Sequence, residues 1–139
     1  MSSKLMEYFN KQPRLGTLST SAKDGKVDVA VFGSPRMIDE NSVYMGIGKN
    51  RSFSYLQQNP YAVYMIMEPG KGLADWKGIR MYLKVKNIAT SGTIFDTYKR
   101  QLAEAIGEAA AGMIHAGVTF EVVEVRPVVD MGQGWEKSV

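Results

Sequence analysis

The chain is dominated by short runs in which apolar and polar residues alternate, which is the two-residue period of β-strands. The clearest run extends from Ile79 to Val85, where every second residue is apolar and the residues between are polar or charged. Comparable runs predict strands at residues 15–20, 26–33, 43–47 and 118–125, with a further short strand before the polar turn at 39–42. Residues 61–67 are all apolar, which indicates a strand buried on both faces.

The first two predicted strands are joined by Asp24-Gly25, a strong signal for a hairpin turn. Within the second strand, the valines at 27, 29 and 31 share one face, and residues 28, 30 and 32 share the other. The chain therefore begins its sheet with an antiparallel pair.

Helical spacing is found in two further stretches. Ser2 or Ser3 can cap a helix through about Asn10, and Ser91 or Thr93 can cap a second helix that Gly107 and Gly112 weaken at its end. The apolar residues of the first helix are Leu5, Met6 and Phe9, and the stripe of the second is Tyr98, Leu102, Ala105 and Ala109. Asp96 and Arg100 are spaced as an exposed ion pair. Hairpins interrupted by helices predict a small antiparallel β-barrel with helices packed outside.

The stretch from Met45 to Pro60 combines a strand end, two glycines, a cluster of donors and a short helix. The first amides of a helix have no internal acceptor and carry partial positive charge, so they attract an anion such as a phosphate. Asn50 or Ser52 can cap this helix, and Lys49 and Arg51 add positive charge. The alternative is an ordinary surface helix with solvated charges, because Gly-x-Gly-Lys is not a P-loop pattern.

The composition restricts the class of protein, its partners and its compartment. The 139 residues predict one domain, 1–139, whose 45% hydrophobic and 22% charged residues exclude a disordered chain. The formal charge of +3 is spread along the chain, so no nucleic acid is expected as a partner, and no apolar run is long enough to span a membrane. A signal peptide and cysteines are absent, so the cytoplasm is the expected compartment.

Catalytic side chains are scarce. Without Cys and with one His, the Cys/His zinc sites are excluded and no metal is expected. His115 lies among small residues and is interpreted as a loop histidine, with a catalytic role as the alternative. Residues 68–76 form a glycine-rich loop whose Trp76 either anchors it to the surface or covers a ligand. Any chemistry is therefore expected from a bound cofactor.

The ordered set of segments 15–20, 24–25, 29–34 and 43–60 resembles the pyridoxamine 5'-phosphate oxidase-related FMN-binding split-barrel proteins. No single motif is specific, but the match covers most of the chain. The resemblance implies a mainly β fold with flanking helices, a small antiparallel split β-barrel. It also implies a homodimer with two FMN molecules at the interface and a small-molecule or protein redox partner.

The resemblance also implies roles for particular residues. The flavin phosphate would contact Lys49, Asn50, Arg51 and Ser52. The ring would lie along Val31, Phe32, Gly33 and Ser34, with Met45 and Gly46 on its other side. Lys77, Gly78 and Trp135 are weaker assignments, and Trp135 would reach the partner's flavin.

The sequence departs from the oxidases in three places. Those enzymes commonly have Ser-Arg-Lys in the phosphate loop where this chain has Asn50-Arg51-Ser52, and an Arg where Val31 stands here. Their C-terminal Arg and His have no counterpart in residues 132–139. Vitamin B6 oxidation is therefore not expected.

Four functions are compatible with these residues. The first is an FMN-dependent oxidoreductase that transfers a hydride or electrons, and the second is a non-catalytic flavin-binding electron carrier or sensor. The third is a protein that binds another phosphate-bearing cofactor, such as a deazaflavin, or a nucleotide. The fourth is a structural dimer in which the anion site is only a helix start.

Overall fold

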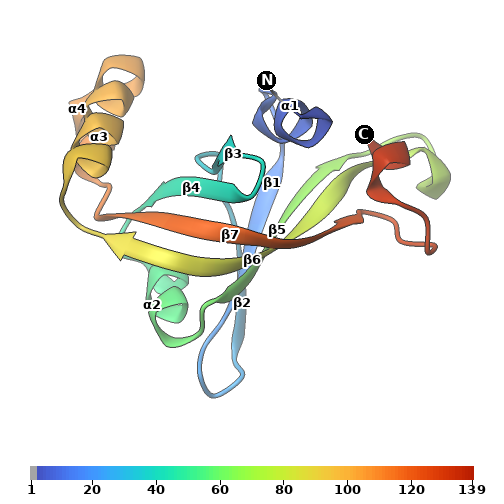
Figure 1. Ribbon diagram of the computed structural model, residues 1–139, viewed down its shortest axis with the longest axis horizontal. Helices are drawn as coiled ribbons and strands as arrows, with labels where there is room; N and C mark the ends of the chain where they lie inside the picture. Colours follow the sequence, from blue (N-terminus) through green and yellow to red (C-terminus); the bar gives the residue numbers. More distant parts are fainter. Residues whose placement is uncertain (1–2) are drawn as a thin grey trace.

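The computed structural model describes residues 3–139 and contains one antiparallel sheet of seven strands (Figure 1). The strands are β1 Gly16–Ser21, β2 Val27–Val31, β3 Arg36–Asp39, β4 Ser42–Ile47, β5 Tyr61–Glu68, β6 Lys77–Ala89 and β7 Ala116–Pro127. Their order in the sheet is β2-β1-β5-β6-β7-β4-β3. The prediction of a mainly β fold with flanking helices is confirmed.

The helices lie around this sheet. They are α1 Lys4–Asn10, α2 Arg51–Gln58, α3 Thr93–Ile106 and α4 Glu108–Gly112, with the 3-10 turns η1 Leu73–Asp75 and η2 Trp135–Ser138. Ser3 caps α1 by accepting a hydrogen bond from the Met6 amide at 3.1 Å, and the alternative cap Ser2 lies outside the described residues. Within the described residues no helix has the length and apolarity needed to cross a bilayer.

The sheet is strongly curved but not closed, since β2 and β3 are its two free edges. Figure 1 shows β1 and β2 running across the direction of β6 and β7. The prediction of a small antiparallel split β-barrel is confirmed, and the barrel is open between β2 and β3. Closure would require a pairing between β2 and β3, which local alternation does not encode.

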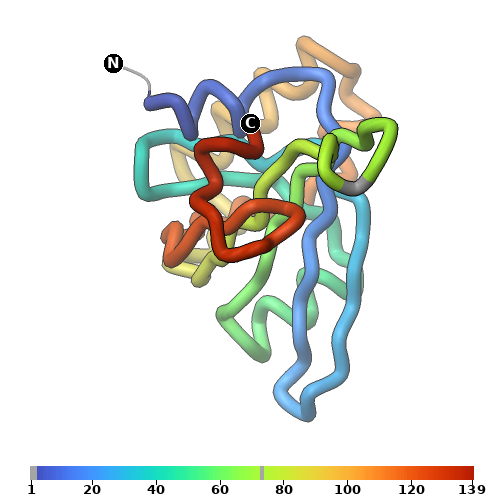
Figure 2. Tube along the Cα trace, turned by 90° about the vertical axis from the view of Figure 1, so that its right-hand side faces the viewer, coloured from blue at the N-terminus to red at the C-terminus, as the bar shows by residue number. Residues whose placement is uncertain are grey.

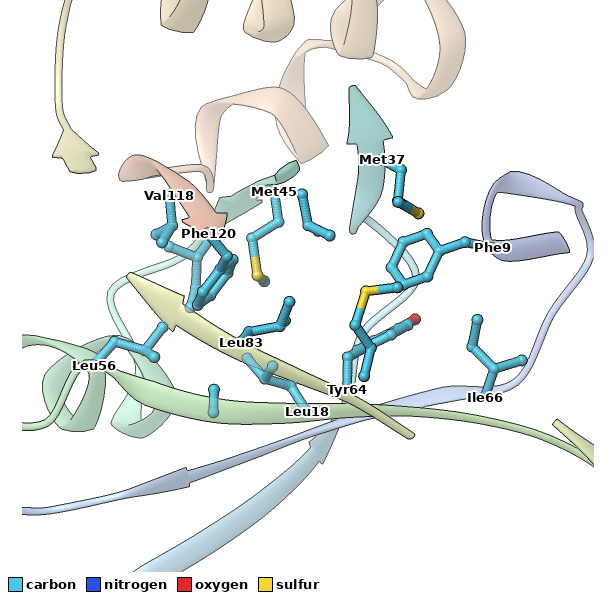
Figure 3. Close-up of a cluster of buried hydrophobic side chains, with 14 of the residues drawn as sticks. Phe9, Leu18, Met37, Met45, Leu56, Tyr64, Ile66, Leu83, Val118 and Phe120 are labelled. Carbon is cyan, nitrogen blue, oxygen red and sulfur yellow. The ribbon is translucent and has the colours of Figure 1, made fainter. Parts of the chain in front are cut away.

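The hydrophobic core fills the inner face of the curved sheet (Figure 3). Every second residue of β6, and of the first half of β7, is buried against this core, which confirms the alternation predicted for these two strands. All six residues of β4 are buried, so the alternation predicted for β4 is not seen in its burial. Phe9 from α1 and Phe53 and Leu56 from α2 close the core at its ends. The run 61–67 is fully buried on one face and only half-buried on the other, so the prediction of burial on both faces is only partly correct.

β2 is the exception to this inward pattern. Val27, Val29 and Val31 point outward and are 79%, 62% and 72% exposed. In Figure 2 the β1–β2 hairpin extends beyond the rest of the chain. An edge strand with an exposed row of valines is a surface that a ligand or another chain is expected to cover.

α3 differs from its prediction in its cap and its buried face. Gly92 occupies the N-cap position without a side-chain hydrogen bond, so neither Ser91 nor Thr93 caps the helix. The one residue of α3 that is fully buried is Phe95, whereas Tyr98 and Leu102 are half-buried and the two alanines of the predicted stripe are exposed. Little of the helix is buried because it projects from one end of the sheet (Figure 1). Gly107 ends it as predicted, with a φ of 98°.

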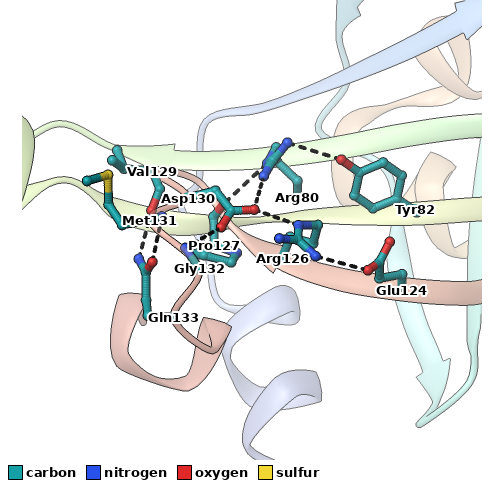
Figure 4. Close-up of polar contacts among 10 residues, drawn as sticks. All are labelled: Arg80, Tyr82, Glu124, Arg126, Pro127, Val129, Asp130, Met131, Gly132 and Gln133. Atoms are coloured by element: carbon teal, nitrogen blue, oxygen red, sulfur yellow. Dashed lines mark hydrogen bonds and ion pairs between the residues drawn. The ribbon is translucent and has the colours of Figure 1, made fainter.

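The C-terminal tail is fixed to the outer face of the sheet by an ion cluster (Figure 4). Asp130 accepts hydrogen bonds from Arg80 on β6 at 2.8 Å and from Arg126 on β7 at 2.5 Å. Arg126 also pairs with Glu124 at 3.2 Å. The hydrogen bonds from Arg126 and from the Gly132 amide lower the pKa of Asp130 below its usual range. The attachment of the tail to the sheet is therefore expected to depend on pH.

We expect acid to loosen the tail. Because the folded-state pKa of Asp130 is lowered, its contacts stabilise the tail above the ordinary carboxyl pKa of about 4 and are lost as the pH falls through the lowered value. The measurement is Trp135 fluorescence against pH in a Trp76→Phe background. Asp130→Asn should abolish the transition below about pH 4, and Asp24→Asn, which breaks an exposed pair with Lys26, should leave it unchanged. A transition that survives Asp130→Asn would contradict this role.

Candidate functional site

The start of α2 is built as predicted. The side chain of Asn50 accepts a hydrogen bond from the Phe53 amide at 2.9 Å, which makes Asn50, not Ser52, the N-cap. In the part of the chain that the structure describes, no acceptor contacts the amides of Arg51 and Ser52. The side chains of Lys49 and Arg51 are exposed beside these amides. This turn therefore offers two free amides and two cations to an anion.

Ser52 links this turn to β2. Its side chain is buried, and its hydroxyl donates to the carboxylate of Asp28 on β2 at 3.4 Å. Sequence reasoning missed Asp28, because the alternation of β2 shows which residues share its face but not that α2 packs there. The contact joins the predicted phosphate turn to β2, the strand that leads into the predicted ring segment, and it places a carboxylate beside the predicted phosphate site.

The free edge of β2 presents backbone groups to solvent. The Phe32 amide bonds the Gly16 carbonyl at 3.1 Å, so in the antiparallel register the even residues of β2 pair with β1. The amides and carbonyls of Val27, Val29 and Val31 therefore point away from β1. Beyond the strand, no acceptor within residues 3–139 contacts the amides of Gly33 and Ser34.

Two side chains hold the segment after β2 from the inside. Tyr64 donates from its hydroxyl to the Phe32 carbonyl at 2.5 Å. Arg14 donates to the carbonyl oxygens of Gly33, at 3.2 Å, and of Pro35, and its guanidinium stacks on the Tyr64 ring. These carbonyls already have donors, so the amides of the segment are the groups left for a ligand. Sequence reasoning missed both side chains, since neither lies in a recognisable motif.

Ser34 and Gly46 are adjacent in the structure. The Ser34 hydroxyl donates to the Gly46 carbonyl at 3.1 Å, which joins the end of the β2 segment to β4. The ring of Tyr98 from α3 lies over Gly46, where any side chain would overlap it. Burial raises the pKa of Tyr98, and polar contacts with Gly46 and Ser34 oppose this rise. The Met45 side chain points into the core with no exposed surface, which leaves its backbone for the predicted contact with the ring.

The three weaker assignments lie elsewhere. Lys77 and Gly78 pair with Glu68 and Met67 at the far end of β5, about 20 Å of strand from Tyr61, where β5 begins after α2. Figure 1 shows the start of β6 beside the C-terminus, away from α2. Trp135 is half-buried against the core in η2. Within one chain these residues do not join the α2 site, because local sequence does not show at which end of a long hairpin a residue falls.

His115 lies next to α2, a position that the sequence did not predict. Its amide bonds the Ile47 carbonyl at 2.8 Å, and its exposed ring packs edge-on against Phe53 at 5.2 Å between ring centroids. The interpretation of His115 as a loop residue agrees with its position before β7. No charged partner holds its ring among the described residues.

The fold is shared with proteins of known structure. An FMN-binding protein from Syntrophomonas wolfei is 22% identical over 89% of this chain and 82% of its own, with a TM-score of 0.73. A putative pyridoxamine 5'-phosphate oxidase from Lactobacillus delbrueckii is 14% identical over 90% and 92%, with a TM-score of 0.62. The heme storage protein HutZ from Vibrio cholerae is 15% identical over 93% and 96%, with a TM-score of 0.65.

No protein-family model and no curated protein matches the sequence of the chain. At these identities the likeness concerns the fold. The chain therefore has the fold of the flavin-binding split-barrel proteins.

Proposed function

We propose that the protein binds FMN between the start of α2 and the free edge of β2 and acts as an FMN-dependent oxidoreductase. The contact between Ser52 and Asp28 carries this proposal, because it joins the anion-binding turn to the strand with free backbone amides. From Asp28 to Val31 the strand advances about 10 Å. An extended ribityl phosphate can bridge that separation.

Different groups of the chain would bind the phosphate and the ring of the flavin. The amides of Arg51 and Ser52, with the side chains of Lys49 and Arg51, would hold the phosphate. The backbone of residues 31–34 would pair with the polar edge of the ring, held in place by Arg14 and Tyr64. When bound, the flavin would supply reversible uptake of electrons. Asp28 fits less well, because its charge opposes a phosphate.

A homodimer is part of the proposal. The exposed valines of β2 belong to the outer face of the sheet. Val29 is paired there with Ser19 of β1, Ser19 with Val63 of β5, and Val63 with Tyr82 of β6. This outer face carries few charges on β1, β2 and β5, and α2, which contacts β1 and β2, packs on their other face. A second copy of the chain would cover this face and enclose the flavin.

Charge on this face should therefore separate the subunits. We expect the wild-type chain to have about twice its monomer mass of 15.4 kDa by analytical ultracentrifugation, and Val29→Lys to shift it to the monomer, because burying an unpaired ammonium is costly. Ile38→Lys is the control, since Ile38 is 55% exposed on the opposite edge strand. A monomeric wild type, or a Val29→Lys chain that stays dimeric, would contradict this interface.

The test of the cofactor is the visible spectrum of the freshly purified protein, with any chromophore released and identified by mass. Flavin bands with FMN released support the proposal. A colourless protein that takes up no added FMN contradicts it, and a Soret band would point to heme, as the likeness to HutZ also allows. Steady-state oxidation of reduced nicotinamide with several acceptors then separates an enzyme from a carrier or sensor.

A further inference from the structure

Two consecutive backbone amides after β2, those of Gly33 and Ser34, have no acceptor within residues 3–139. They are bounded on both sides, because the Phe32 amide bonds the Gly16 carbonyl and Pro35 has no N–H. Apart from its chain neighbours, no described residue lies within 4 Å of a Cβ added at Gly33, so a ligand can approach the backbone there. The segment therefore offers two adjacent donors to one ligand.

Each of these amides belongs to a peptide unit whose carbonyl is already hydrogen-bonded. The Gly33 amide shares its unit with the Phe32 carbonyl, which accepts from the Tyr64 hydroxyl at 2.5 Å. The Ser34 amide shares its unit with the Gly33 carbonyl, which accepts from the Arg14 guanidinium at 3.2 Å. Both units are trans, so each N–H points away from the donor on its own carbonyl. The two amides thus face away from Tyr64 and Arg14.

Tyr64 and Arg14 polarise these peptide units. A hydrogen bond to a carbonyl draws electron density from the whole unit, and hydrogen bonds in a chain strengthen one another in this way. Tyr64 lies in the core (Figure 3) and has no exposed surface, so its hydroxyl reaches a ligand only through the Phe32 peptide. Burial raises the pKa of Tyr64, although Arg14 opposes the rise, so the hydroxyl is protonated at neutral pH and can donate. Arg14 adds a permanent positive charge.

Polarised amides of this kind favour an acceptor that carries negative charge. Backbone N–H groups held in place before a ligand binds stabilise charge that develops on it, as in an oxyanion hole. A flavin gains electrons when it is reduced, and groups beside the polar edge of its ring tune that gain. The proposed function assigns this edge to the backbone of residues 31–34. The two amides would therefore hold reduced flavin more tightly than oxidised flavin.

We propose that Tyr64 and Arg14 are positioning residues that raise the reduction potential of the bound flavin, acting through the peptide units that begin at Phe32 and Gly33. This inference rests on the proposed function, since it needs a flavin at this segment. Neither side chain has to touch the flavin. A shift of the potential distinguishes this role from a structural one, because a residue that only supports the fold would weaken the binding of both forms equally.

The experiment measures the two-electron potential of FMN bound to the full chain, and the dissociation constants of oxidised and reduced FMN. Tyr64→Phe should lower the preference for reduced FMN about threefold, because one hydrogen bond strengthens the next only in part. By the two-electron relation, this change lowers the potential by about 14 mV. Arg14→Met also removes a charge and should lower the preference about tenfold, which corresponds to about 30 mV.

Two further variants serve as controls. Arg14→Lys keeps the positive charge and should recover most of the potential lost in Arg14→Met. Tyr8→Phe also removes a hydroxyl hydrogen bond, but the Tyr8 hydroxyl donates to the carboxylate of Glu68 and to no carbonyl of this segment. This variant should keep the wild-type potential, and a fall equal to that of Tyr64→Phe would overturn the proposal.

The outcomes separate this inference from the proposed function. If the chain takes up no FMN, both fail. If FMN binds and Tyr64→Phe keeps the wild-type potential, or weakens the binding of both forms equally, only this inference fails. If Tyr64→Phe does not fold, Arg14→Met decides, and an unchanged potential in that variant would overturn the inference.

Discussion

Replacing Arg51 by Ala is expected to raise the dissociation constant for FMN at least tenfold, because charge-assisted hydrogen bonds to a phosphate are among the strong ones. Arg51 is exposed at the first position of α2, where its own amide and that of Ser52 are free, and within the described residues its side chain makes no hydrogen bond or ion pair. The change should therefore alter binding and not stability. The measurement is a titration of apoprotein into FMN, followed by flavin fluorescence, with thermal unfolding recorded alongside.

Two further variants make this result specific. Arg36→Ala removes another exposed arginine, on β3, and should leave FMN affinity unchanged. Asp28→Asn should act in the opposite direction and tighten binding about fivefold, because it removes a carboxylate next to Ser52 at a cost in repulsion of about 1 kcal/mol. If Arg51→Ala binds FMN as the wild type does, the phosphate does not lie at α2.

The second large effect is expected on stability, from Gly78→Ala. Gly78 has a φ of 139°, and an added Cβ would overlap the carbonyl oxygen of Ile66 on the paired strand β5. Backbone strain and overlap with a fixed carbonyl together should lower the free energy of unfolding by about 3 kcal/mol. Urea unfolding followed by circular dichroism measures it.

Gly25→Ala is the matched control for this change. Gly25 also has a positive φ, of 91°, but nothing lies near an added Cβ in the hairpin turn. Its cost should be only the conformational one, about 1 kcal/mol. Equal losses of unfolding free energy in the two variants would show that the overlap at Gly78 is relieved. If Gly78→Ala instead lost FMN affinity and kept its stability, Gly78 would belong to the flavin site.

The sequence by itself determined the local elements. Alternation placed the strands because a strand packed on a core must be apolar at every second residue, and β6 and β7 follow this rule. Asn50 and Pro60 fixed the short helix α2, because a cap and a helix stop act through neighbouring residues. The same locality made the turn at Asp24-Gly25 predictable. The donors at the start of α2 followed from these facts alone.

Only the tertiary structure decided how these elements meet. Alternation gives two faces to β2 but not which one is inside, and the valines turned out to face solvent because the inner side of β2 lies against α2. The contact of Ser52 with Asp28, the clamp by Arg14 and the cover of Tyr98 over Gly46 each join residues distant in sequence. Such contacts depend on strand order and curvature, and these arise from the packing of the whole sheet, which no local pattern contains.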